Sequence, residues 1–231
     1  MKTKEVKKII RDSLQLDEDL NEAYAASPKH YQLNTELLLS KTKKSHDELY
    51  QAYVARLNDL SAKLDVVDKR EADGAHSAFR SIKIDEQYNM NAVYLHELYF
   101  SNISDPYSEI PLDSIPHMRL HRDFGTFDLW QNDFFACGMA VRDGGWVVCG
   151  YSFYLQKLVN VIVDGHDMHC LMGFYPLIVL DMWEHARRDY LNNKKDYLIS
   201  MMKEFNWNVI SERFKKLDLV AKVVGGNNQW T

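Results

Sequence analysis

The sequence predicts an α+β protein in which a long helical hairpin precedes a domain of helices and strands. Two observations carry this prediction: apolar residues recur at helical spacing through the first half of the chain, and short β-branched runs follow residue 145. With 231 residues, 46% of them hydrophobic, the chain can bury a substantial core. We expect four regions in order, an N-terminal helical extension, a helical hairpin, an α+β domain and a polar tail, at residues 1–32, 33–110, 111–219 and 220–231.

Helical periodicity dominates the first hundred residues. The extension has an amphipathic pattern at Val6, Ile9, Ile10 and Leu14. From Leu38 to Leu64 the apolar residues step by three or four positions, which predicts one face of a long helix along Leu49, Tyr53, Leu57, Leu60 and Leu64. The same spacing recurs between Tyr88 and Ile103, where His96 lies inside the apolar stripe. We expect the two long helices to pack as an antiparallel hairpin.

Prolines mark the boundary between the two domains. The segment from Ser104 to Pro116 holds three of the five prolines and is predicted to be a linker. A further helix is expected from Phe127 to Val141, ended by Gly144 and Gly145. After this helix, short β-branched runs replace the helical periodicity and predict three strands. A helical pattern returns from residue 183 onward. The three strands are expected around residues 146–149, 158–163 and 177–180.

Charge and composition exclude several classes of protein. The 28 Lys and Arg against 33 Asp and Glu leave −5 at pH 7, and the lysines at 41, 43 and 44 form too small a cluster for a nucleic-acid interface. The longest apolar stretch, Leu171 to Leu180, is shorter than the roughly 20 residues of a membrane span. The charged start lacks a signal segment, and the three cysteines are too few for a disulfide framework. We expect a cytoplasmic protein with reduced Cys137, Cys149 and Cys170.

The sharpest chemical motif is Asp181-Met182-Trp183-Glu184-His185-Ala186, directly after an apolar run. Asp181 and His185 are four residues apart and share one side of a helical turn, where a carboxylate and an imidazole can bind manganese, iron or zinc. The alternative is an ordinary helix N-terminus, with Asp181 as its cap and His185 on the surface.

Two further histidines lie on the predicted hairpin. A buried imidazole without a hydrogen-bond partner at position 96 would destabilise the fold by about 1–3 kcal/mol. We therefore expect a bonding partner for the His96 nitrogen. His46 lies one helical turn before Tyr50, on the helix expected to pack against that of His96. Each has a plainer alternative, a hydrogen-bonded core histidine at 96 and a solvated polar position at 46.

A series of short motifs runs in one order through residues 35–215. They are Ser40–His46, Tyr53–Asn58, His96–Phe100, Phe124–Phe127, Gly145-Trp146, Gly165–Asp167, Asp181–Ala186, Asp196-Tyr197 and Asn206–Asn208. In these motifs the chain resembles the iron/manganese superoxide dismutases. The resemblance implies that family's fold, with a three-stranded antiparallel sheet in the second domain. It also implies a redox cycle at one iron or manganese ion, which converts superoxide to dioxygen and hydrogen peroxide.

The resemblance implies roles for individual residues as well. The metal ligands would be His46, His96, Asp181 and His185, with solvent in the fifth place. Tyr53 matches the family's active-site tyrosine. His166 stands where manganese-type members usually carry a glutamine that hydrogen-bonds this solvent, and Ala92 where iron-type members carry theirs. Trp146 and Trp183 match the aromatic wall of the pocket.

Departures from the family pattern concern the solvent gate. His46 and Tyr53 are seven residues apart, one fewer than in the family, and a regular helix would keep them on one face. Tyr50 replaces the family's gateway histidine, and Arg187 replaces a tyrosine after the Glu-His-Ala motif. Together these two replacements alter the solvent gate, and with it proton delivery and rate, and leave the ligand set intact. The alternative is that the positive Arg187 near the funnel helps to attract the anionic substrate.

The resemblance also implies a homodimer, in which Glu184 reaches the partner subunit's His185. Glu184 as a solvated helix charge is the alternative. Two other functions are compatible with the sequence. One is a structural or interaction protein that keeps this fold within a larger assembly such as a virion, with residues 1–32 as the assembly device. The other is a zinc hydrolase on the same cluster, although no His-Glu-x-x-His motif occurs.

Overall fold

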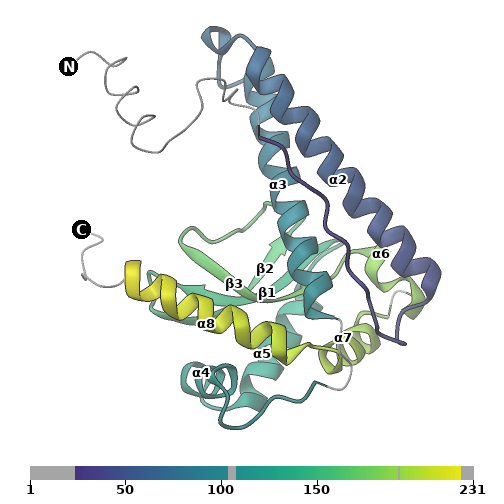
Figure 1. The fold of residues 1–231 in the computed structure, drawn as a ribbon, viewed down its shortest axis with the longest axis vertical. Coiled ribbons are helices and arrows are strands. Elements are labelled where there is room, and N and C mark those ends of the chain that lie inside the picture. Colours follow the sequence, from purple (N-terminus) through teal and green to yellow (C-terminus); the bar gives the residue numbers. More distant parts are fainter. Residues whose placement is uncertain (1–23, 104–107, 192, 225–231) are drawn as a thin grey trace.

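The computed structural model describes residues 24–103, 108–191 and 193–224 and has the predicted α+β architecture (Figure 1). Two long helices, α2 (Ser40–Val66) and α3 (Ala78–Asn102), lie side by side as the expected hairpin. The buried face of α2 differs from the predicted stripe, because it runs through His46, Tyr50 and Val54 rather than through Leu49 and Tyr53. His46 is therefore turned toward α3 and the sheet, not toward solvent.

The helix predicted at residues 6–14 lies outside the described residues. The described part of the extension, residues 24–32, contains no helix and runs along the hairpin as the dark purple segment of Figure 1. We call it the N-terminal strap. The Tyr24 backbone N–H donates to Ser61 Oγ at 2.9 Å, and the Asn58 side chain exchanges two hydrogen bonds with the backbone of Ala26. The strap is also bonded to α3, where the Tyr24 hydroxyl donates to Glu86, so both helices of the hairpin hold it in place.

A helix that the sequence did not predict begins in the last two residues of the predicted linker. Helix α4 (Ile115–Phe124) begins after Ser114, whose hydroxyl accepts from the His117 backbone N–H, and Pro116 lies in its first turn. Proline is tolerated there because the first backbone N–H groups of a helix need no partner within it. Helix α5 (Phe127–Ala140) follows as expected, capped by Thr126.

The second half of the chain is organised around a three-stranded antiparallel sheet. Its strands are β1 (Gly145–Ser152), β2 (Lys157–Asp164) and β3 (Phe174–Asp181), in the order β2-β1-β3. Helices α3 and α8 contact β3, while α5 contacts β1 and β2. Trp146 of the central strand β1 pairs with Val163 of β2 on one side and with Asp181 of β3 on the other. This register places the carboxyl end of β3 beside the hairpin.

Helices follow the sheet, as the sequence predicts. They are α6 (Glu184–Arg187), α7 (Lys194–Lys203) and the longer α8 (Trp207–Val224), with the 3-10 turn η2 at Arg188–Tyr190 after α6. A second 3-10 turn, η1 at Lys69–Glu71, lies between the two hairpin helices. Because α8 continues to Val224, the first residues of the predicted tail (220–224) are helical and only 225–231 lie beyond the described part. Within the described residues, no helix is both long and apolar enough to cross a membrane.

Candidate metal centre

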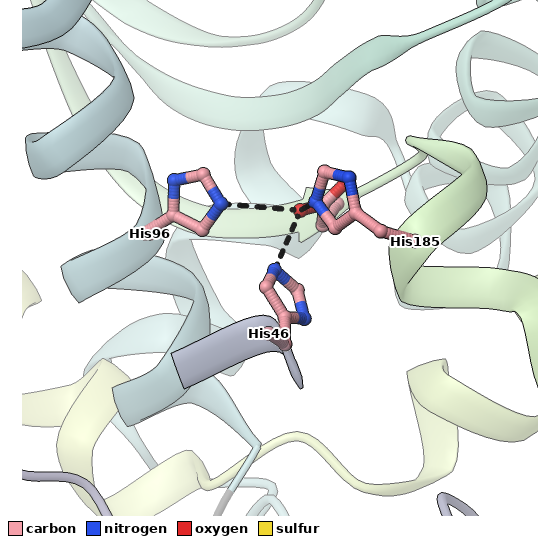
Figure 2. A group of neighbouring side chains, drawn as sticks. His46, His96 and His185 are labelled. Atoms are coloured by element: carbon pink, nitrogen blue, oxygen red, sulfur yellow. Dashed lines mark hydrogen bonds and ion pairs between the residues drawn. The ribbon is translucent and has the colours of Figure 1, made fainter. Parts of the chain in front are cut away.

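Four side chains from four separate elements converge at one point. His46 comes from α2, His96 from α3, Asp181 from the end of β3 and His185 from α6. The three imidazole Nε2 atoms lie 3.2, 3.8 and 3.3 Å from one oxygen, Asp181 Oδ2, in that order of histidines (Figure 2). The sequence motif and the two isolated histidines therefore form one group.

The prediction that Asp181 and His185 share a helical turn is wrong. Asp181 is the last residue of β3, and α6 begins only at Glu184. The two side chains still meet because the chain turns at Met182 and Trp183, where the Trp183 backbone N–H donates to Asp181 Oδ1 at 2.7 Å. That bond occupies one carboxylate oxygen and leaves the other facing the histidines.

The orientation of His96 leaves a lone pair directed at the cluster. Its Nδ1 lies 2.6 Å from the Ala92 carbonyl oxygen, one turn earlier on α3. A carbonyl only accepts hydrogen bonds, so Nδ1 carries the proton and Nε2 is the free base. This is how metal-binding histidines are usually held.

Two buried nitrogens of the cluster lack hydrogen-bond partners among the described residues. His46, His96 and Asp181 are fully buried, and Nε2 of both histidines makes no hydrogen bond with any described residue. Such orphaned nitrogens are costly without a ligand. Metal–ligand bonds of about 2.0–2.2 Å to one shared ion would produce donor separations like the 3.2 to 3.8 Å seen here. The cluster therefore fits a metal ion.

Protonation equilibria also favour a metal. Burial lowers the pKa of His96 to about 3 and shifts the pKa of His46 in the same direction, so both imidazoles are neutral at pH 7. Burial opposes ionisation of Asp181, but the neighbouring His185 and His46 hold the pKa of its carboxyl well below the usual range. Imidazole nitrogens together with one anionic oxygen form a donor set suited to iron, manganese or zinc.

His166 and Tyr53 lie together beside this cluster. Trp146 Nε1–H donates to His166 Nδ1 at 3.0 Å, and His166 Nε2 lies 3.1 Å from the Tyr53 hydroxyl. Because Nδ1 accepts, Nε2 carries the proton of the neutral ring and donates it to Tyr53. The Tyr53 ring packs 5.4 Å from His96, and α2 is a regular helix from residue 46 through 53. The seven-residue interval therefore brings both side chains to the same place.

Two tryptophans enclose these groups, as the resemblance implies. Trp146 is fully buried and stands edge-on to His96, with ring centroids 4.9 Å apart. Trp183 stacks on His185 at 6.0 Å and on His166 at 5.2 Å. Its ring lies so close to the backbone that a Cβ at Gly144 would meet it at 2.2 Å, which explains the glycine there.

The remaining candidates point elsewhere. The Tyr50 hydroxyl donates to Glu97 Oε1 and accepts from the Lys29 backbone N–H, both at 3.0 Å, so it anchors the N-terminal strap. Arg187 is buried and its Nε donates to the Met182 carbonyl. Glu184 is exposed next to His185.

Asp189 is a residue of this region that the sequence did not indicate. The N-cap position of α2, Leu39, has no capping side chain, and Asp189 Oδ2 accepts its backbone N–H at 2.8 Å from 150 residues further along the chain. Asp189 Oδ1 accepts from the Thr42 hydroxyl at 2.7 Å. One carboxylate thus joins the start of the His46 helix to the segment after His185. No local spacing signals such a contact.

Asp189→Ala is expected to lower the melting temperature and weaken metal binding together. Loss of a capping carboxylate costs about 1–2 kcal/mol, which corresponds to about 2–8 °C in a chain of this size. Calorimetry and metal titration would measure both effects. Asp68→Ala, which removes the carboxylate that caps the exposed three-residue turn η1 far from the ligands, is the matched control and should leave metal binding unchanged. An unchanged melting temperature would contradict the assigned capping role.

Comparison with known proteins gives consistent matches. Residues 116–213 match the family model described as iron/manganese superoxide dismutases, C-terminal domain. An iron superoxide dismutase of Aquifex pyrophilus is 34% identical over 171 residues, which cover 72% of this chain and 79% of that protein. A similar match to an iron enzyme of Cupriavidus metallidurans has 33% identity over 73% of this chain and 84% of that protein. A manganese superoxide dismutase of Haloferax volcanii is 29% identical over 74% and 83%.

Proposed function

Because this chain belongs to the iron/manganese superoxide dismutases, it is an oxidoreductase that converts superoxide to dioxygen and hydrogen peroxide with one iron or manganese ion, and we propose which residues perform the reaction. The proposed ligands are His46, His96, Asp181 and His185. The proposed proton-handling residues are Tyr53 and His166, within a pocket walled by Trp146 and Trp183. Neither the assembly protein nor the zinc hydrolase considered above is favoured by these matches.

One observation carries the ligand assignment. Two buried imidazole nitrogens, on His46 and His96, have no hydrogen-bond partner among the described residues and face the same carboxylate oxygen as His185. A buried structural cluster would instead satisfy its own donors and acceptors.

The residues around the ion prepare the site for proton transfer. When bound, the ion supplies one-electron oxidation and reduction between its trivalent and divalent states. Trp146 keeps the His166 proton on Nε2, which donates to the Tyr53 oxygen. Burial raises the pKa of Tyr53 to about 12, so its hydroxyl holds a proton at neutral pH. Hydrogen peroxide formation consumes two protons, and Tyr53 holds one of them beside the ligand His96.

Elemental analysis with a superoxide-consumption assay on the same sample tests this proposal. We expect about one iron or manganese per chain, and activity that is lost on chelation and restored by one of these metals. Zinc as the stoichiometric metal, or metal-loaded protein that does not consume superoxide, would contradict it.

We also propose a homodimer in which Glu184 contacts the partner subunit's His185. Its exposed position next to a ligand supports the proposal. Truncating one member of a buried charged contact costs about 2–5 kcal/mol, so Glu184→Ala should raise the dimer dissociation constant at least about 30-fold. Sedimentation at several concentrations would measure this, with Glu48→Ala as the exposed control. A monomeric wild-type protein would refute the dimer, and a mass above the dimer would indicate the larger assembly.

The compartment is proposed to be cytoplasmic. All three cysteines are free, including the fully buried Cys149, and free thiols are typical of reducing compartments. Cell fractionation followed by immunoblotting would test this assignment.

A further inference from the structure

A pair of histidines lies outside the metal centre, on helix α4 beside α5 and α8 (Figure 1). His117 and His121 are four residues apart in this helix, so they project from the same face of it. Their ring centroids are 6.5 Å apart. Among the proposed ligands His46, His96 and His185 the corresponding separations are 4.6 to 5.9 Å. A small rotation of the side chains therefore brings both α4 imidazoles within reach of one ion.

The nitrogens of both imidazoles are available to a ligand. Within the described part of the chain, neither ring makes a hydrogen bond or an ion pair with another residue. The His117 ring is half-buried and stacks on Phe127, with centroids 5.5 Å apart and an interplanar angle of 21°. This stacking restricts the orientation of His117, while the exposed His121 is free to turn toward it.

Ion pairs and hydrogen bonds fix the helix that carries the pair. Arg119, midway between the two histidines in sequence, is ion-paired with Asp218 of α8. Arg122 is ion-paired with Asp123, which also accepts the Leu158 backbone N–H of β2 at 2.7 Å. These carboxylates neutralise the two arginines of α4, so they reduce the repulsion that a bound cation would meet. A fixed helix also keeps the two imidazoles close together before an ion arrives, which lowers the entropic cost of binding.

We propose that His117 and His121 form a second metal site, which binds one late first-row divalent ion, such as Cu²⁺, Ni²⁺ or Zn²⁺, through two imidazoles and solvent. Imidazole nitrogens suit these ions, and copper binds such sites most tightly. The site is separate from the redox centre, whose proposed ligands come from α2, α3, β3 and α6. The proposal therefore does not depend on the dismutase reaction.

Titration with Cu²⁺ of protein whose metal centre is already filled with iron tests the proposal. We expect calorimetry to show one additional Cu²⁺ per chain, and the electron paramagnetic resonance spectrum to show two coordinated nitrogens. Two linked binding groups hold a partner about 10²–10⁴-fold more tightly than either does alone. His117→Ala and His121→Ala should therefore each raise the dissociation constant for Cu²⁺ at least about 100-fold. Because His121 is exposed, its replacement leaves the packing of the fold unchanged.

Two controls separate a chelating pair from nonspecific binding to histidine. His76→Ala removes an exposed histidine at the tip of the hairpin and should leave the dissociation constant unchanged. Adding Arg122→His to His121→Ala restores the number of histidines but spaces them five apart, off the shared face, and should not restore binding. Loss of the additional ion in both alanine variants and its retention in His76→Ala would support the site. No additional Cu²⁺ in the wild type, or an unchanged affinity in either alanine variant, would overturn the proposal.

Discussion

His96→Ala is expected to abolish superoxide dismutation and to remove the bound metal. His96 supplies a nitrogen that is already unprotonated and aimed, since its Nδ1 is held by the Ala92 carbonyl. Residues that merely orient a ligand contribute about 10–100-fold to metal affinity or activity, so losing the ligand itself should cost at least about 100-fold. Elemental analysis and superoxide consumption on the same preparation would measure both losses.

Controls must separate ligand loss from a damaged core, because His96 is fully buried. His185→Ala removes another proposed ligand at the partly exposed edge of the cluster, where packing is disturbed less. His76→Ala removes an exposed histidine at the tip of the hairpin and should change neither metal content nor activity. If His96→Ala and His185→Ala both folded and retained metal, the ligand assignment would be wrong.

The second large effect is expected from Arg213→Leu, which should lower the free energy of unfolding by at least about 3 kcal/mol. Arg213 on α8 is nearly buried, and its guanidinium donates to the Leu177 carbonyl at 2.7 Å and to the Leu98 carbonyl at 2.9 Å. It also bonds the side chains of Asn102 and Ser101. Burial lowers its pKa to about 10, so it is charged at pH 7. Removal would strand several buried acceptors at once.

Arg213 joins the end of α3 to β3 and α8, so its loss should act on the whole fold. The melting temperature should fall by about 6–12 °C, at about 2–4 °C per kcal/mol. Arg213→Lys should recover only part of the loss, because a lysine lacks the planar fork that reaches several acceptors. Arg56→Leu, which removes an exposed ion pair with Asp59, should cost less than about 1 kcal/mol. Equal melting temperatures for Arg213→Leu and the wild type would contradict this role.

The sequence predicted the elements well where the local pattern is strong. The hairpin helices, α5 and the three strands lie where apolar periodicity and β-branched runs indicated. It missed α4, because Pro116 looks like a breaker in sequence and is an N-terminal helix residue in space. The predicted buried face of α2 was wrong, because the apolar pattern placed Leu49 in the core and left His46 in solvent. Burial of His46 becomes favourable only when the four-residue cluster is packed.

For the site, the motif around Asp181 and the histidine inside an apolar stripe were visible in the sequence. Their assembly into one cluster came only from the resemblance to a family. The residue types Asp and His at a spacing of four suggested a helical turn, whereas the structure reaches the same proximity through a strand end and a tight turn. Asp189 was not indicated at all, because its contacts join residues about 150 positions apart in the chain.

The sequence by itself determined the periodic elements, the ligand types and, through its ordered motifs, the family. Those properties depend on neighbouring residues or on short fixed spacings, which a linear pattern records. Only the tertiary structure decided which nitrogens are orphaned, how Asp189 joins the start of α2 to the segment after His185, and how Arg213 joins α3 to β3. Hydrogen bonding and burial depend on how close residues lie in space, and in this chain the residues of the site come together from α2, α3, β3 and α6, which are far apart in the sequence.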